Sequence, residues 1–429
     1  MTLRIAFAGM THLGLISGLA AAAKGFSVVC FDPGQERIAA LNVGQLPVSE
    51  PGLEALRSEV AGRVRFAADP DALRDCQLVY VAPDVPTDAG GGSDLRGLEE
   101  LLDLVAAHVE PGTPVVLLSQ VPPGFTRAHQ RPEFALLYQV ETLVFGRAVE
   151  RALAPERIIL GLPDGGQPLP PALAAFLDRF DCPQLPMAFE SAELAKIAIN
   201  VCLVASVTVA NTLAEVCESI GADWHDIVPA LKLDRRIGPH AYLMPGLGIA
   251  GGNLERDLAT VRELASIHGA DARLIDAFIG NSRHRRDWAL RVLAQGLGAL
   301  RDGCKVAVLG LAYKEDTAST KNSAALALIG HLNGLALSVY DPLVSAAAAG
   351  LNGAVEATGA LEACQGAEAV LLMTPWPAFR EIRPAALAEA MVGRLVVDPY
   401  GLLDHEDCRA AGLDHRRLGR PLSPETQSC

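Results

Sequence analysis

Hydrophobic positions dominate one long stretch of the chain, from Ser191 to Ser219, which contains no Gly or Pro. The pattern predicts one helix of about 29 residues, roughly 43 Å long at 1.5 Å per residue, with Ser191 as its N-cap. Apolar side chains cover most of the circumference, so we expect burial on nearly all sides. Lys196, Asn200 and Asn211 nevertheless fall within about 60° of one another and form a polar seam.

This polar seam has more than one interpretation. Lys196 is either a functional cation on a buried helix or a lysine whose stem lies along the core while its charge reaches water. A membrane span is a further reading of so apolar a helix. We disfavour it because the uninterrupted apolar runs are short and the flanks lack positive charge.

The first 32 residues follow the order strand, glycine turn, helix, strand, acid. Leu3–Ala8 precedes the turn Gly9-Met-Thr-His-Leu-Gly14, and Leu15–Lys24 leads to Ser27–Phe31 and Asp32. This order is typical of a dinucleotide-binding βαβ unit, in which the helix N-terminus faces the pyrophosphate. A carboxylate at Asp32 accepts hydrogen bonds from the adenosine ribose and repels a 2′-phosphate, so the sequence predicts NAD rather than NADP.

One position departs from the glycine fingerprint, because Thr11 stands where a second glycine allows close approach to phosphate. We expect this change to affect cofactor affinity rather than the fold. The predicted cofactor-binding residues lie in the glycine turn, at the ribose acid and at the ends of later strands. They are Gly9, Thr11, His12, Leu13, Gly14, Asp32, Arg37, Pro83, Ser119 and Gln120.

Further short apolar runs on both sides of the long helix are continuous rather than alternating, which indicates buried parallel strands. They are Gln77–Ala82, Pro114–Ser119, Arg157–Gly161, Lys305–Gly310, Leu337–Asp341, Ala369–Met373 and Leu395–Asp398. We therefore predict an α/β protein with two Rossmann-like doubly wound domains, joined by a long central helix and a helical middle domain. The expected boundaries are 1–183 for the NAD-binding domain, 184–300 for the helical domain and 301–429 for the second Rossmann-like domain.

Composition narrows the choice of partners and compartment. The chain has 429 residues, half of them apolar, and a formal net charge of −14, which argues against nucleic acid and anionic membranes as partners. Nine cysteines occur without CxxC pairs, as expected of free thiols in a reducing, cytoplasmic environment. We expect no signal peptide, since the N-terminus opens a strand, and no metal site, since His-rich ligand spacing is absent.

Eight segments, taken in order, give the chain a more specific resemblance. They are Val48-Ser-Glu-Pro-Gly-Leu53, Ser119-Gln-Val-Pro-Pro-Gly124, Gln139-Val-Glu-Thr-Leu143, Pro155-Glu-Arg-Ile158, Ala192-Glu-Leu-Ala-Lys-Ile-Ala-Ile-Asn200, Asp234-Arg-Arg-Ile-Gly238, Pro245-Gly-Leu-Gly248 and Gly310-Leu-Ala-Tyr-Lys314. Over nearly its whole length the chain resembles the UDP-glucose/GDP-mannose 6-dehydrogenase family. The resemblance implies NAD as cofactor, a nucleotide-sugar substrate bound partly by the C-terminal domain, and a homodimer formed through the central helix.

The family oxidises a sugar's primary alcohol twice, first to the aldehyde and then to the acid. The resemblance assigns Glu141, Lys196, Asn200 and Asp257 to the catalytic set, with Asn253 at the position of the family's catalytic cysteine. It assigns substrate binding to Arg236, Gly248 and Lys314.

Three departures concern the second oxidation, which in the family passes through a covalent thiohemiacetal and needs a thiolate. Asn253 replaces the cysteine, and a carboxamide is not a nucleophile at neutral pH. Gln120 replaces a threonine thought to position a water, and Phe145 replaces a glutamate that serves thioester hydrolysis. A cation and a carboxylate suffice for one reversible hydride transfer, so the retained residues fit the first oxidation.

Three functions remain open from the sequence. The leading hypothesis is an NAD-dependent nucleotide-sugar oxidoreductase limited to two-electron chemistry, including transient oxidation with epimerisation. The second is four-electron oxidation through an aldehyde hydrate. The third is a non-catalytic nucleotide-sugar-binding protein, which Thr11 favours and the retained Lys196, Asn200 and Asp257 disfavour.

Plain structural roles also remain open for single residues. Glu141 and Asp257 could simply pair with arginines. Asn253 could cap a turn after Gly252, and Arg236 could be a surface residue.

Overall fold

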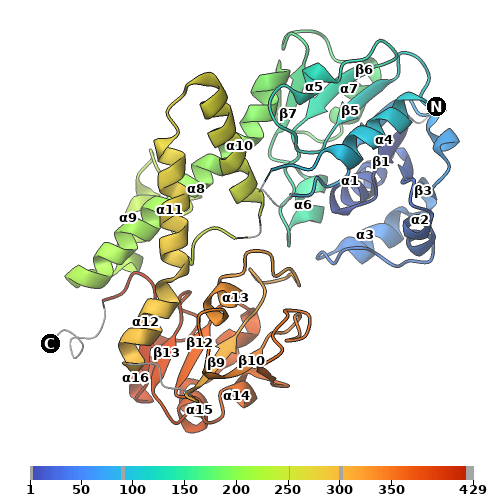
Figure 1. The fold of residues 1–429 in the computed structure, drawn as a ribbon. Helices are drawn as coiled ribbons and strands as arrows, with labels where there is room; N and C mark the ends of the chain where they lie inside the picture. Colours follow the sequence, from blue (N-terminus) through green and yellow to red (C-terminus); the bar gives the residue numbers. More distant parts are fainter. Residues whose placement is uncertain (1–2, 88–91, 251, 299–302, 422–429) are drawn as a thin grey trace. The chain divides into compact units, whose positions relative to one another are not determined.

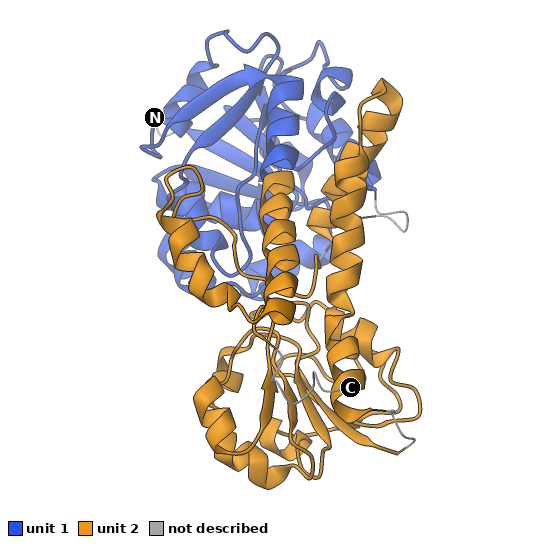
Figure 2. Cartoon of the chain, turned by 90° about the vertical axis from the view of Figure 1, so that its left-hand side faces the viewer, with its two compact units in different colours: residues 1–199 blue, residues 200–429 orange. Residues whose placement is uncertain are grey.

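The computed structural model describes residues 3–87, 92–250, 252–298 and 303–421 (Figure 1). The chain forms two compact units, residues 1–199 and 200–429, and the boundary between them falls within the long helix α8 (Phe189–Ile220) (Figure 2). The division into three domains stays a prediction.

The first unit is built on an eight-stranded sheet in the order β3-β2-β1-β4-β5-β6-β7-β8. Neighbouring strands are parallel except β6 and β7, which are antiparallel. The strands are β1 (Arg4–Ala8), β2 (Ser27–Phe31), β3 (Val64–Ala67), β4 (Leu78–Val81), β5 (Pro114–Leu117), β6 (Ala135–Gln139), β7 (Ile158–Leu162) and β8 (Gln184–Ala188). The helices before α8 are α1 (His12–Ala23), α2 (Gln35–Asn42), α3 (Leu53–Val60), α4 (Arg96–Ala106), α5 (Phe125–Ala128), α6 (Ala148–Leu153) and α7 (Pro171–Leu177).

Both faces of this sheet are covered, which explains why its central strands are apolar throughout. Helices α1, α2, α3, α6 and α7 contribute to the core on one face. Helices α4 and α5, together with the start of α8, contribute to the core on the other. Because β1, β2, β4 and β5 are parallel, their carboxyl ends share one edge of the sheet, where a loop or turn continues the chain from each strand.

The second unit contains the rest of α8, four further helices and a six-stranded parallel sheet in the order β11-β10-β9-β12-β13-β14. The helices before the sheet are α9 (Trp224–Leu233), α10 (Asn253–His268), α11 (Arg273–Arg286) and α12 (Trp288–Leu297). The sheet and its helices are β9 (Lys305–Leu309), α13 (Ala324–Ile329), β10 (Ala336–Tyr340), β11 (Val355–Glu356), α14 (Ala360–Ala363), β12 (Ala369–Leu372), α15 (Pro384–Ala390), β13 (Leu395–Val397), α16 (His405–Ala410) and β14 (Asp414–Arg416). The predicted fold class, two parallel sheets and a long central helix, is confirmed.

Helix α8 differs from its prediction in two respects. It begins at Phe189, so Ser191 lies inside its first turn and the N-cap assignment was wrong. The expected burial on nearly all sides was also wrong, because Val209, Leu213, Val216 and Ile220 are 44–69% exposed. An apolar pattern shows which faces of a helix can be buried. Which of these faces are covered depends on how the rest of the chain packs against the helix.

Helix α8 is also long and apolar enough to cross a membrane, judged by length and composition alone. The core helices of soluble proteins meet the same criterion, so this carries little weight.

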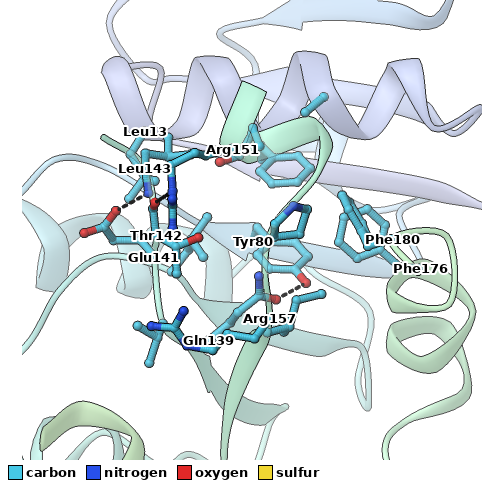
Figure 3. Close-up of a pocket in the computed structure, with 18 residues that line it drawn as sticks. Leu13, Tyr80, Gln139, Glu141, Thr142, Leu143, Arg151, Arg157, Phe176 and Phe180 are labelled. Carbon is cyan, nitrogen blue, oxygen red and sulfur yellow. Dashed lines mark hydrogen bonds between the residues drawn. The ribbon is translucent and has the colours of Figure 1, made fainter. Parts of the chain in front are cut away.

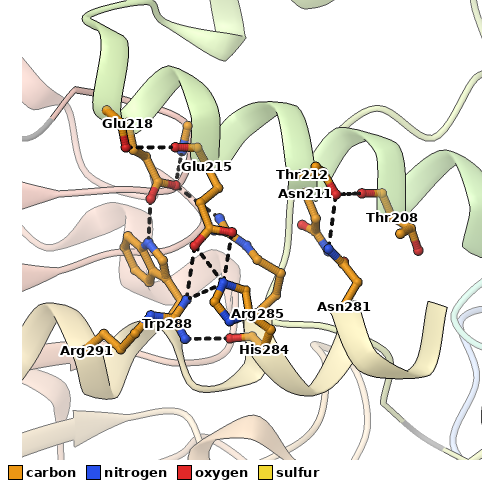
Figure 4. Close-up of polar contacts among 12 residues, drawn as sticks. Thr208, Asn211, Thr212, Glu215, Glu218, Asn281, His284, Arg285, Trp288 and Arg291 are labelled. Atoms are coloured by element: carbon orange, nitrogen blue, oxygen red, sulfur yellow. Dashed lines mark hydrogen bonds and ion pairs between the residues drawn. The ribbon is translucent and has the colours of Figure 1, made fainter. Parts of the chain in front are cut away.

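Polar side chains hold the C-terminal end of α8 against α11 and α12 (Figure 4). Glu218 accepts hydrogen bonds from Arg285 Nη2 at 3.0 Å and from Trp288 Nε1 at 2.9 Å. It also accepts one from the Gly419 N–H at 2.9 Å. Arg285 is fully buried, so its charge depends on Glu218 and on Glu215, whose Oε2 lies 3.3 Å from Arg285 Nη1. One carboxylate therefore joins four segments of the second unit.

Replacing Glu218 should destabilise the second unit. Glu218→Ala leaves the buried guanidinium of Arg285 with only the partly exposed Glu215, and we expect the free energy of unfolding to fall by about 3 kcal/mol. All three tryptophans lie in this unit, so urea unfolding followed by tryptophan fluorescence measures the loss. Glu263→Ala, which removes an exposed carboxylate from α10, is the control. Equal stabilities of the two variants would contradict the prediction.

Candidate active site

The glycine turn between β1 and α1 has no room for side chains at two of its positions. Gly9 has φ +95°, and a Cβ there would lie 2.8 Å from the Pro83 nitrogen. A Cβ on Gly14 would lie 2.0 Å from the Gly9 carbonyl oxygen. Both contacts are closer than atoms tolerate, so the tight turn and the close packing of α1 on the strand require glycine. These are the roles of the first and third glycines of a dinucleotide-binding turn, whereas the second, which allows close approach to phosphate, is Thr11 here.

Thr11 and His12 form the start of α1 and both contact the loop after β4. Thr11 is the N-cap, and its Oγ1 accepts a hydrogen bond from the Asp84 N–H at 2.7 Å. The His12 N–H in turn donates to Asp84 Oδ2 at 2.9 Å. Asp84 was not among the predicted site residues. Its position in a Pro- and Asp-rich loop offered no sequence signal for a contact with a turn more than 70 residues earlier, and the centre of that loop lies outside the described residues.

Asp32 lies directly after β2, as predicted for the ribose acid, and is only 3% exposed. Its Oδ2 accepts hydrogen bonds from the Met10 N–H at 2.8 Å and Arg37 Nη1 at 2.7 Å, and its Oδ1 accepts one from the Gly34 N–H at 2.9 Å. Two carboxylate oxygens offer about four acceptor sites, so the carboxylate shapes the turn and keeps capacity for a ribose hydroxyl. Arg37, which was predicted to bind the cofactor, pairs with the Asp32 carboxylate in this structure.

Ser119 and Gln120 follow β5 at the same edge of the sheet. The Ser119 hydroxyl donates to the Pro83 carbonyl at 2.5 Å and ties this turn to the loop after β4. The next turn is held by Glu193 of α8, whose carboxylate accepts the N–H groups of Gly124 at 2.6 Å and Thr126 at 2.8 Å. Burial raises the pKa of Glu193, although these hydrogen bonds oppose the shift. Sequence reasoning missed Glu193 as a site-shaping residue, although it stands in one of the matching segments.

Glu50 connects the glycine turn to the loop after β6. Its Oε1 lies 2.9 Å from His12 Nε2, and its Oε2 accepts the Gly146 N–H at 2.9 Å. Phe145 stacks on the His12 ring with 4.2 Å between ring centroids. Phe145 therefore has a packing role at a position where the family carries a glutamate. Glu50 also stands in a matching segment, and its position there was the available signal.

Lys196 and Glu141 form a close ion pair within the first unit. Lys196 Nζ lies 2.7 Å from Glu141 Oε1, and their side chains are 13% and 17% exposed. Glu141 Oε2 accepts the Leu143 N–H at 3.0 Å, which fixes the carboxylate. The lysine thus faces a carboxylate from a loop rather than open solvent, and its functional role stays a prediction.

A cavity of about 550 Å³, which includes space open to solvent, lies beneath the Glu141 loop (Figure 3). Glu141 lies toward one end of it, and Phe176 and Phe180 of the α7 region toward the other. The Arg151 side chain lines it as well and donates through Nε to the Thr142 carbonyl at 2.8 Å. The cavity is thus polar near the loop and apolar away from it.

Asn200 and Asp257 form the corresponding pair in the second unit. Asn200 Nδ2 donates to Asp257 Oδ2 at 2.5 Å, and Asp257 is 1% exposed. Arg256 Nε lies 3.8 Å from Asp257 Oδ1 and is also buried. Asn200 follows Lys196 by one turn of α8, so one helix carries a member of each pair.

The loop that leads to Asn253 is held by two side chains of the second unit. Asn211 Oδ1 accepts the Gly246 N–H at 2.8 Å, and Ser282 Oγ accepts the Ile249 N–H at 2.8 Å. Gly248 has φ +80° and packs directly against Ser282, which explains the glycine. Asn253 itself is exposed and is the first residue of α10. Gly252, at φ +93°, occupies the N-cap position, so the helix starts without help from the Asn253 side chain.

The other predicted residues are less enclosed. Arg236 is 89% exposed along its side chain and pairs with Asp234 at 2.7 Å, as a surface arginine does. Lys314 lies over the Tyr313 ring at 5.9 Å in the second unit. Within the described part of the chain, no group of three or more His, Cys, Asp or Glu residues is placed to hold a metal ion.

Comparison with known proteins agrees with this geometry. The chain matches three domains of the UDP-glucose/GDP-mannose dehydrogenase family: the NAD binding domain over residues 3–167, the central domain over 190–282 and the UDP binding domain over 307–405. It is 30% identical to the UDP-glucose 6-dehydrogenase of Rhizobium meliloti, with 98% of this chain and 100% of the relative covered. It is 29% identical to UDP-glucose 6-dehydrogenase TuaD of Bacillus subtilis, covering 99% and 95%.

Solved structures give the same result. A UDP-glucose dehydrogenase from Pyrobaculum islandicum has a TM-score of 0.81 at 27% identity, covering 89% of this chain and 92% of that one. A UDP-D-ManNAc dehydrogenase from Pyrococcus horikoshii has a TM-score of 0.85 at 22% identity, covering 98% and 100%, and supports the fold. With all three domain matches in order and a relative 30% identical over nearly the whole chain, the chain belongs to the UDP-glucose/GDP-mannose dehydrogenase family and is an NAD-dependent nucleotide-sugar dehydrogenase.

Proposed function

We propose that this family member oxidises an alcohol of a UDP-linked sugar by a single hydride transfer and stops at the carbonyl. The proposal rests on Asn253, which the family resemblance assigns to the position where the second oxidation needs a sulfur nucleophile. A carboxamide orients and hydrogen-bonds but does not add to an aldehyde. The relatives named as UDP-glucose 6-dehydrogenases support UDP-glucose as the first substrate to test.

The retained residues suit the first oxidation. The Lys196 ammonium, held 2.7 Å from Glu141, places a cation where an alkoxide develops as the hydroxyl loses its proton. Glu141, or Asp257 held by Asn200, offers a carboxylate that accepts the proton directly or through water. NAD, when bound, takes the hydride. These groups complete a two-electron step without covalent attachment of the sugar.

The residues of the second oxidation are absent together. The family's water-positioning threonine is Gln120, and its second loop glutamate is Phe145, whose ring packs on His12. A phenyl ring neither accepts nor donates the protons that thioester hydrolysis needs. Three independent changes in one half-reaction support loss of that half-reaction rather than a single tolerated substitution.

Four-electron oxidation is the second candidate, and the names of the curated relatives favour it. Water adds to the aldehyde to give a geminal diol, which loses a second hydride to NAD and a proton to yield the acid. This route needs no thiol. It does need the aldehyde to stay bound while it hydrates, and Asn253 provides no bond to retain it.

The ratio of NADH to sugar separates these two functions. With UDP-glucose and excess NAD, we expect about one NADH for each sugar consumed and an aldehyde that a carbonyl reagent traps. Absorbance at the NADH band and mass analysis of the sugar give both quantities. Two NADH per sugar together with a uronate would establish the four-electron reaction instead.

A matched variant tests the role of the other two departures. Asn253→Cys restores the thiol, and Gln120 and Phe145 remain. We expect this variant not to release uronate at a steady rate. The new thiol would hold the aldehyde and give a thioester with a second NADH, but without the hydrolytic groups the thioester would stay on the enzyme, where mass analysis of the intact protein detects it.

Lys196 should be required for hydride transfer. Lys196→Ala removes the cation beside the developing alkoxide, and loss of one such group lowers kcat about 10²–10³-fold. Initial rates at saturating UDP-glucose measure the change, and NAD titration shows whether the cofactor site is intact. Lys232→Ala on α9 is the control and should keep full activity. Near-normal turnover of Lys196→Ala would remove this lysine from the mechanism.

We also propose that the protein is a homodimer through α8. Val209, Leu213, Val216 and Ile220 are exposed at spacings of four, three and four residues, which is the seam of a helix packed on another helix. Nothing in the described chain covers them fully. The family resemblance supports the same face.

Charge placed in this seam should dissociate the dimer. Leu213→Glu buries a carboxylate against apolar side chains in the assembly, and we expect a monomer at micromolar concentration. Sedimentation velocity measures the mass. Leu274→Glu alters a more exposed leucine on α11 and should leave the dimer intact. A dimer that survives Leu213→Glu would mean that another surface forms the interface.

A further inference from the structure

The N-terminus of α1 already holds a carboxylate of the chain itself. In dinucleotide-binding βαβ units the first amides of this helix face the cofactor's pyrophosphate, because they lack partners within the helix and carry partial positive charge. Here the first of them, the His12 N–H, donates to Asp84 Oδ2 at 2.9 Å. A side-chain anion therefore stands where a ligand anion is expected.

The loop that carries Asp84 is held firmly on its N-terminal side. The Asp84 N–H donates to Thr11 Oγ1 at 2.7 Å and Asp84 Oδ2 accepts the His12 N–H, so two bonds join Asp84 to the start of α1. Pro83 packs against Gly9, and its carbonyl accepts the Ser119 hydroxyl. The Asp84 backbone is thus fixed beside the turn, and only its exposed side chain is free to rotate.

Other carboxylates add to the negative charge at this turn. Asp32 accepts the Met10 N–H, and Glu50 lies 2.9 Å from the His12 ring. Among the carboxylates that the structure describes, however, Asp84 is the one that contacts an amide at the helix end. A pyrophosphate that approached this amide would meet the Asp84 carboxylate at hydrogen-bond distance from the same donor, and like charges at such separations repel.

We propose that Asp84 occupies the pyrophosphate subsite in the free protein and that NAD binds by displacing its carboxylate. The residue stabilises the empty turn and at the same time weakens cofactor binding. Removing the Asp84 carboxylate should therefore lower the stability of the free protein and raise its affinity for NAD. Loss of a residue with a merely structural role would not raise that affinity. The inference rests on the NAD site of the family and does not depend on which sugar is oxidised or how far.

Two substitutions separate the effect of the negative charge of Asp84 from the effect of its hydrogen bond to the His12 N–H. Asp84→Asn keeps an oxygen that accepts the His12 N–H but removes the charge, and Asp84→Ala removes both. We expect the Kd for NAD to fall about tenfold in Asp84→Asn and at least as much in Asp84→Ala, because a charged acceptor binds an amide more strongly than a neutral one. The Tm of the free Asp84→Ala protein should fall, because α1 loses its acceptor.

The measurement is isothermal titration of the full-length protein with NAD, ADP-ribose and adenosine. ADP-ribose carries the pyrophosphate, so its affinity should rise in the Asp84 variants as much as that of NAD. Adenosine lacks the pyrophosphate, so its affinity should be the same in the variants and the parent protein. Asp94→Asn is the control, since it removes the same charge from the same loop at a residue paired with Arg96. It should leave the NAD affinity unchanged.

Three results would overturn the proposal. One is an unchanged or weaker affinity for NAD in both Asp84 variants when the parent protein binds NAD. Another is a loss of affinity in Asp84→Asn that appears only with Mg²⁺ present, which would mean that a metal bridges Asp84 and the pyrophosphate. If neither the parent nor the variants bind NAD, the proposal fails together with the cofactor site, whereas the first two results leave that site standing.

Discussion

The cost of burying an unpaired polar group shapes α8 and the loops around it. The helix is apolar overall, and each polar side chain on its enclosed faces needs a partner from another element because an unsatisfied buried group costs several kcal/mol. Each such partner belongs to a loop or to another helix of the same unit. The pairs are Glu193 with the α5 turn, Lys196 with Glu141, Asn200 with Asp257, Asn211 with the Gly246 loop, and Glu218 with Arg285. One helix thereby positions elements that are distant in sequence.

The need of buried polar groups for partners also applies to the candidate catalytic residues. Lys196 and Glu141 need each other to be buried, as do Asn200 and Asp257, so these groups persist whether or not every step of the family reaction survives. Asn253, Gln120 and Phe145 do not belong to these α8 pairs. Asn253 starts α10 without acting as its cap, and Phe145 packs on His12.

The glycine turn shows how a binding site can be stable before its ligand arrives. Its amides are satisfied by the chain's own carboxylates, Asp32 at Met10 and Asp84 at His12. Donors aimed at an anion carry a cost when they are left unpaired. A side-chain anion removes that cost in the free protein, and the ligand must then compete with it.

The sequence alone determined the fold class and the βαβ unit with Asp32. These follow from local rules: apolar runs mark buried strands, and only glycine fits the crowded turn at Gly9 and Gly14. Strands such as β3, β6 and β8 escaped prediction because they are short or partly exposed, and the long helix started two residues before its expected cap. The described residues confirm the fold class and leave the site assignments as predictions.

Tertiary structure decided which groups meet. Asp84 lies more than 70 residues from the turn it caps, Glu50 joins His12 to Gly146, and Glu193 holds a turn that belongs to another strand. No periodicity encodes such contacts, because the two partners come together only when separate strands take their places in the sheet. The exposed face of α8 has the same origin: hydrophobicity is a property of the residues, whereas burial depends on what packs against them.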